Sequence, residues 1–105
     1  MAYELNDHPY GGRSAIAVGQ RLKLMRQALG MKQREFARML EIAPNSYSQL
    51  ENGRNHPSID ILWRIIDKLP QHNIDMNWLM AGEPGGLRHD FAVLLKSMYD
   101  HRLTL

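Results

Sequence analysis

The segment "MKQREFARMLEIAPNSYSQLENG", residues 31–53, carries the most informative pattern in this chain. Its apolar residues recur at helical spacing in two short stretches, which predicts one helix over 33–40 and a second over 44–52. Proline at the first position of the second helix is favourable there, because that N–H has no partner inside a helix. The side chains expected to face inward are Phe36, Ala37, Leu40, Tyr47 and Leu50.

The outward face of the second helix is polar and uncharged. Two short helices joined by about three residues are typical of a helix-turn-helix, whose second helix enters the major groove of DNA. Asn45 and Gln49 are four residues apart and share a face, and such amides can bond bidentately to adenine. An ordinary solvated helix pair would show the same polar face. On the first interpretation the base-reading residues are Pro44, Asn45, Ser46, Ser48 and Gln49.

Basic residues are concentrated in the same part of the chain. The net charge is +2, but residues 13–54 carry eight Lys or Arg against three Asp or Glu. A basic half suits a polyanion such as DNA, and chance clustering on a solvated face fits the charge equally well. The residues expected to reach DNA phosphates are Lys32, Gln33, Arg34, Asn52 and Arg54.

The remaining sequence predicts further helices and no strand, so the fold class is all-α. Ser14 is a suitable cap for a helix that ends before Gly30, and Ser58 is a suitable cap for one ending near residue 69. Shorter patterns predict helices over 75–81 and 88–102. We therefore expect a flexible arm at 1–13, a helical domain at 14–82, and a linker with a C-terminal helix at 83–105.

Several classes of site have no support in the sequence. There is no cysteine, which excludes disulfides and thiolate zinc sites and fits a reducing cytosol. No stretch approaches the length of a membrane span, and the first residues do not resemble a secretory signal. No catalytic motif, cofactor motif or metal-binding spacing was found, so we expect neither an enzyme nor a cofactor. The histidines, expected on loops or the surface, are His8, His56, His72, His89 and His101.

Ordered motifs carry a resemblance to a known family. They are "RLK" with Arg26, Q-x-E-F-A at 33–37, S-x-x-E-N-G at 48–53, "PS" at 57–58 and "NWLMAGEP" at 77–84. Together they resemble the helix-turn-helix of the Cro and phage-repressor class, also called the xenobiotic-response-element family. The resemblance implies a five-helix, lambda-repressor-like DNA-binding domain of bacterial or phage type, here with an additional C-terminal helix.

The resemblance also implies roles for individual residues. Gln33 matches a glutamine that bonds a phosphate and can brace the recognition helix. Pro44, Asn45 and Gln49 match base-reading positions, with Ser46 and Ser48 beside them, and Asn52 matches a phosphate contact. Arg26 and Glu51 match a partly buried structural ion pair, and Trp78 matches a tryptophan that closes the core.

The sequence departs from the family pattern at the turn and at the helix caps. Glu41 stands where glycine is usual, and a left-handed backbone there would cost about 1 kcal/mol, so an altered turn is expected. Lys32 and Ala43 replace the usual hydroxyl caps, each at a cost of about 1 kcal/mol. About three extra residues, around "PQHN" at 70–73, precede the last helix of the domain.

The functional expectation is a cytoplasmic, nucleoid-associated repressor that binds a palindromic operator as a homodimer through the helix at 44–52. Its partners would be double-stranded DNA, a second copy of itself and a protein such as a toxin or polymerase. Two alternatives remain: an antitoxin that binds DNA and a toxin, and a protein-interaction module that has lost DNA binding. An apolar stripe on the last helix could fold onto the domain or pair with a second copy, which we favour; it comprises Phe91, Leu94, Leu95 and Met98.

Overall fold

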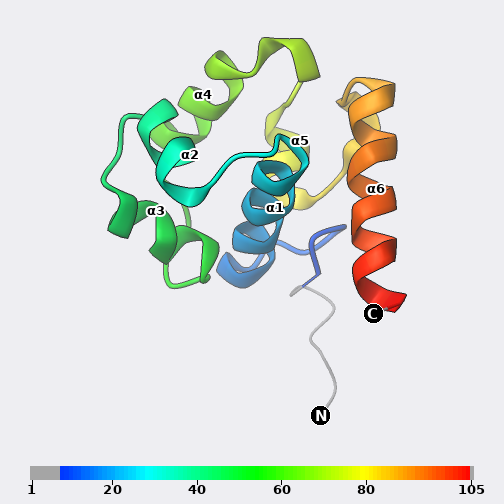
Figure 1. The fold of residues 1–105 in the computed structure, drawn as a ribbon, viewed down its shortest axis with the longest axis horizontal. Coiled ribbons are helices and arrows are strands. Elements are labelled where there is room, and N and C mark those ends of the chain that lie inside the picture. Colours follow the sequence, from blue (N-terminus) through cyan, green and yellow to red (C-terminus); the bar gives the residue numbers. More distant parts are fainter. Residues whose placement is uncertain (1–7, 105) are drawn as a thin grey trace.

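The computed structural model describes residues 8–104, which form six α-helices and contain no strand (Figure 1). The helices are α1 (Ala15–Ala28), α2 (Gln33–Met39), α3 (Pro44–Glu51), α4 (Ile59–Lys68), α5 (Met76–Ala81) and α6 (His89–Thr104). Short 3-10 turns, η2 (Pro70–His72) and η3 (Pro84–Gly86), flank α5. The all-α prediction is confirmed, and each observed helix begins and ends within two residues of its predicted range.

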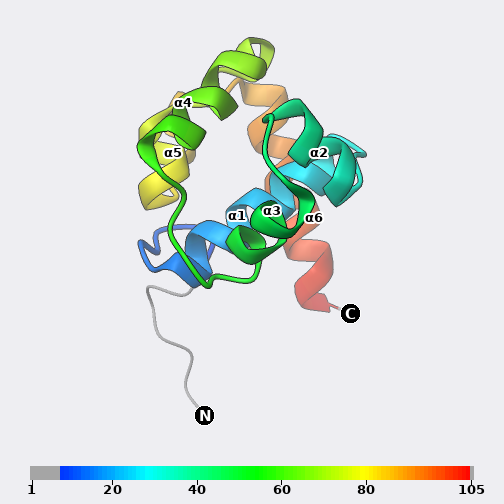
Figure 2. The same cartoon turned by 90° about the vertical axis from the view of Figure 1, so that its left-hand side faces the viewer.

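Helix α1 is the central element of the fold. It contacts α3, α5 and α6, with α3 on one side and α6 on the other (Figure 1). Turning the molecule brings α2 and α3 to the front and leaves α6 behind them (Figure 2). The helix-turn-helix pair and the C-terminal helix therefore occupy opposite sides of α1.

Helix α1 contributes several fully buried apolar side chains. Val18, Leu22 and Met25 have no exposed surface. Leu22 and Met25 share one core with side chains from every other helix. Trp78 of α5 is fully buried too, and its indole N–H donates to the sulfur of Met25 over 3.1 Å. The predicted packing role of this tryptophan is thus confirmed.

The turn between α2 and α3 keeps its left-handed residue despite the lack of glycine. Glu41 has a φ of 60°, and the chain closes with two backbone hydrogen bonds, Glu41 N–H to Arg38 and Ile42 N–H to Ala37, each 3.0 Å long. The guanidinium of Arg64 donates to the carbonyl of Leu40 over 3.1 Å. The expectation of an altered turn is therefore wrong, because these bonds hold the backbone in the strained region.

Residues 8–13 of the expected arm form a turn that contacts α1, while residues 1–7 lie outside the described part of the chain. Pro9 and Gly12 are buried, and their carbonyls accept hydrogen bonds from the guanidinium of Arg21. Arg21 has no exposed surface, and this burial lowers its pKa to about 10. A buried cation without a carboxylate requires such acceptors, so this turn is fixed onto α1.

Helix α6 folds back onto the domain. Phe91 and Leu95 are buried in the common core, with exposures of 3% and 0%. The expected pairing of this stripe with a second copy is wrong for these two residues, because their surface is already covered within the chain. Leu94 remains 41% exposed.

The additional residues before α5 fix the start of α6. The His72 ring stacks on Phe91 with centroids 4.1 Å apart, and the His72 carbonyl accepts from the N–H of Arg88 over 3.0 Å. Asn73 adopts the left-handed conformation and its side-chain amide donates to Gly86 over 2.8 Å. The segment around 70–73, which follows α4 in the chain, thus packs against the beginning of α6.

Replacing Glu41 by glycine should stabilise the protein. The left-handed φ of 60° costs a residue with a Cβ atom about 1 kcal/mol, and glycine removes that cost. We expect Glu41→Gly to raise the free energy of unfolding in urea by about 1 kcal/mol. Glu41→Ala is the control, because alanine keeps the Cβ atom and should give no gain. Equal stability of the two variants would contradict the proposed strain.

Candidate nucleic-acid interface

Helix α3 presents a polar surface opposite its buried side. Tyr47, Leu50 and Glu51 are buried against the domain. Asn45, Gln49 and Asn52, spaced by four and three residues, are exposed on the opposite face. The remaining predicted base-reading residues flank this face: Pro44 and Ser46 are exposed and Ser48 is half-buried. The structure therefore brings the predicted base-reading residues together on one helix.

The ends of α3 are defined by backbone geometry. Pro44 occupies the first turn, and Ala43 supplies no side-chain cap, as expected from the sequence. Gly53 follows the helix with a φ of 74°, and the N–H of Arg54 donates to Gln49 over 3.1 Å. This left-handed glycine and the hydrogen bond after it end the helix.

A buried carboxylate anchors α3 to α1 and α2. Glu51 accepts from the Nε of Arg26 over 2.6 Å and from its Nη2 over 3.2 Å. The Gln33 amide also donates to Glu51 over 2.9 Å, and Arg26 donates to the Met31 carbonyl over 2.8 Å. The predicted ion pair is thus present, and Gln33 braces the recognition helix as the resemblance implied.

The electrostatics of this anchor favour the ionised form of Glu51. Burial alone would raise the pKa of its carboxyl, but the hydrogen bonds from Arg26 and Gln33 outweigh burial and lower it. The hydrogen bond to Glu51 raises the pKa of Arg26 in turn. Burial beside the same carboxylate raises the pKa of the Tyr47 hydroxyl, which therefore stays neutral.

Two residues that sequence reasoning missed also position the interface. At Gly19 of α1, an added Cβ would lie 2.5 Å from the carbonyl oxygen of Leu50 and 2.6 Å from that of Glu51. Only glycine allows α1 and α3 to approach so closely. At the start of α2, the Glu35 carboxylate accepts the backbone N–H of Lys32 over 2.8 Å, which partly replaces the missing hydroxyl cap.

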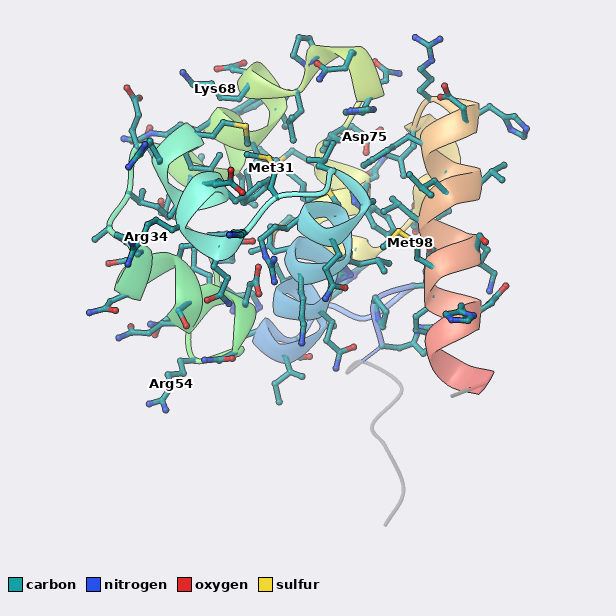
Figure 3. The ribbon with its side chains drawn as sticks, viewed as in Figure 1. Met31, Arg34, Arg54, Lys68, Asp75 and Met98 are labelled. Atoms are coloured by element: carbon teal, nitrogen blue, oxygen red, sulfur yellow. The ribbon has the colours of Figure 1, made fainter. Side chains whose placement is uncertain are left out.

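Exposed cations surround α3 without carboxylate partners. Among the described residues, Arg26 is the only Lys or Arg in the segment 13–54 that forms an ion pair. Arg34 and Arg54 both lie on the side of the molecule that carries α3 (Figure 3). The predicted phosphate contacts Lys32, Arg34, Asn52 and Arg54 are all exposed, whereas Gln33 is half-buried.

Comparison with known proteins identifies the domain. Residues 22–71 match a protein-family model described as helix-turn-helix, the Cro and phage-repressor type of the xenobiotic-response-element family. Residues 22–71 thus form a helix-turn-helix domain of this type, which supports a DNA-binding transcription regulator in general. Neither the curated proteins nor the solved structures searched gave a match.

The described residues contain neither a helix that could span a membrane nor a cluster of metal ligands. Within 8–104 no helix has the length and apolarity that crossing a membrane would require. No group of three or more metal-ligating side chains was found in the same part of the chain.

Removing one partner of the Arg26–Glu51 pair should destabilise the domain strongly. The side chains are only 12% and 2% exposed, so either single change leaves a desolvated charge behind. We expect Arg26→Met and Glu51→Met each to lower the free energy of unfolding by about 3–5 kcal/mol, and the double variant to recover much of that loss. Additive losses in urea denaturation would contradict this coupling.

The same pair predicts a pH dependence. Because folding lowers the pKa of Glu51, its contribution to stability is complete above the ordinary value of 4.5 and disappears as pH falls through the lowered value. The wild type should therefore lose more stability than the double variant between about pH 5 and pH 2. Parallel stability curves over this range would show that Glu51 does not titrate as proposed.

Proposed function

We propose that this protein is a sequence-specific repressor that binds a palindromic operator as a homodimer through α3. The observation that carries the proposal is the exposed amide face of Asn45, Gln49 and Asn52 on a helix fixed by buried contacts. A preorganised helix with uncommitted donors and acceptors is what reading the major groove requires.

The base-reading chemistry follows from the side chains on this face. Asn45 and Gln49 each carry an amide that can donate to N7 and accept from N6 of adenine. Ser46 and Ser48 can serve either kind of base, and the ring of Pro44 offers an apolar contact for the methyl group of thymine. Discrimination between operators therefore depends mainly on the two amides.

The phosphate contacts would supply affinity that does not depend on sequence. Lys32, Arg34 and Arg54 are exposed cations without ion pairs, and each can replace a counterion of DNA. Gln33 uses one amide hydrogen for Glu51, and the second hydrogen of the same NH2 group can reach a phosphate. Asn52 would donate to the backbone from the end of α3.

We infer a homodimer because the base-reading surface of a single α3 is small. One helix of eight residues reads only a few base pairs, which is too little for a unique operator. Two copies would place their α3 helices in successive major grooves about 34 Å apart. Repression would result in the cytoplasm when the bound dimer blocks polymerase at a promoter.

Selection of bound duplexes from a random pool, at two salt concentrations, tests this function. We expect an enriched palindrome with half-sites about one helical turn apart. Binding without enrichment, lost as salt rises, would reject sequence-specific repression. No binding at either salt concentration would instead favour a protein-interaction module, and a co-purifying second protein would favour the antitoxin alternative.

Gln49→Ala should lower discrimination without abolishing binding. Losing one bidentate amide contact should cost the selected operator about 1–3 kcal/mol relative to a scrambled duplex, as measured by competition binding. Arg54→Ala is the matched control, because it should weaken both duplexes equally. If Gln49→Ala also weakens the two duplexes equally, this side chain does not read a base.

A further inference from the structure

Two segments far apart in sequence meet beside the C-terminal end of α3. The His56 Nε2 and the Arg13 carbonyl oxygen are 2.9 Å apart, although 43 residues separate them in the chain. Gly53 lies against Ile16, because an added Cβ there would be 2.7 Å from the Ile16 Cα. These contacts place Arg13, just before α1, next to the loop that carries Arg54 and His56.

The junction has the character of an anion-binding surface. Arg13, Arg54 and His56 are exposed, and neither arginine forms an ion pair. Neither segment 8–34 nor segment 52–59 contains an aspartate or glutamate, so no neighbouring residue in these segments neutralises the two guanidinium groups. Elsewhere in the described chain, Arg64, Arg88 and Lys96 each pair with a nearby aspartate.

The hydrogen bond assigns a role to His56. A carbonyl oxygen only accepts, so the Nε2 of His56 must carry the hydrogen and donate to Arg13. This bond fixes the backbone of Arg13 at the start of α1, where Ser14 already caps the helix through the N–H of Ala17 at 3.0 Å. His56 thus acts on the position of Arg13 and is a positioning residue.

We propose that Arg13 and Arg54, with Arg13 held by His56, form a second DNA-phosphate site beyond the end of α3. This inference rests on the proposed function, and it adds Arg13 and His56 to the contacts derived above. The first phosphate site lies at Lys32–Arg34, at the start of α2, where Gln33 bonds Glu51 of α3. The second site would add contacts to the DNA backbone from the start of α1 and from the loop that follows α3.

The salt dependence of binding tests the role of Arg13. Arg13→Gln and Arg54→Gln should each weaken the selected operator and a scrambled duplex by the same factor, and each should make the log–log salt slope shallower by about one. Lys68→Gln is the control: it removes a cation without an ion pair from the end of α4, well away from Arg54 in Figure 3, and should leave the slope unchanged.

Rescue by a conservative variant tests the role of His56. His56→Ala should reproduce part of the Arg13→Gln loss, whereas His56→Gln retains a donor for the Arg13 carbonyl and should restore binding. In the Arg13→Gln background, His56→Ala should have little further effect. A full additional loss in that background would show that His56 does not act through Arg13 and would overturn this part of the proposal.

The outcomes separate this inference from the function on which it depends. If the wild type binds no duplex, the proposed function itself fails. If the wild type binds and Arg54→Gln makes the slope shallower while Arg13→Gln does not, the second phosphate site is wrong and the function stands. A shallower slope for Lys68→Gln, equal to that for Arg13→Gln, would also overturn the site, because general charge would then explain both.

Discussion

The buried carboxylate of Glu51 holds α3 against α1 and α2. It belongs to the recognition helix, and its donors come from α1 and α2: Arg26 at 2.6 Å and Gln33 at 2.9 Å. A helix of eight residues is too short to be stable alone in water, so its existence and its orientation both come from such tertiary contacts. One charged group thus connects α1, α2 and α3.

Because these buried contacts hold α3 in place, the side chains on its outer face are not needed for packing. Tyr47, Leu50 and Glu51 provide the inward contacts, and Gly19 lets the backbone of α1 come close to the last turn of α3. Substitutions of Asn45 and Gln49 on the opposite face should therefore have little effect on the stability of the domain. Both faces of α3 could therefore be predicted from the sequence. The buried residues are apolar and recur at helical spacing, and the exposed residues have short or planar polar side chains.

The sequence predicted local features well and long-range contacts poorly. The helices followed from apolar spacing, and the resemblance supplied the Arg26–Glu51 pair. Arg21 was missed because its acceptors are backbone carbonyls of Pro9 and Gly12, which no residue type indicates. The strain at Glu41 was anticipated, but its outcome depended on hydrogen bonds between distant segments, such as Arg64 to Leu40. Base contacts stay a prediction, since they require the DNA.

The segments outside the helix-turn-helix act on the same central helix that holds α3. Arg21 of α1 binds the N-terminal turn, and Arg26, on the same helix, binds Glu51. Helix α6 packs against α1 on the side away from α3 (Figure 1), and Tyr10 of the N-terminal turn lies between Trp78 and Tyr99 with ring centroids 5.3 and 5.4 Å away. The N-terminal turn and α6 therefore both pack against α1, the helix whose Arg26 holds Glu51 of α3.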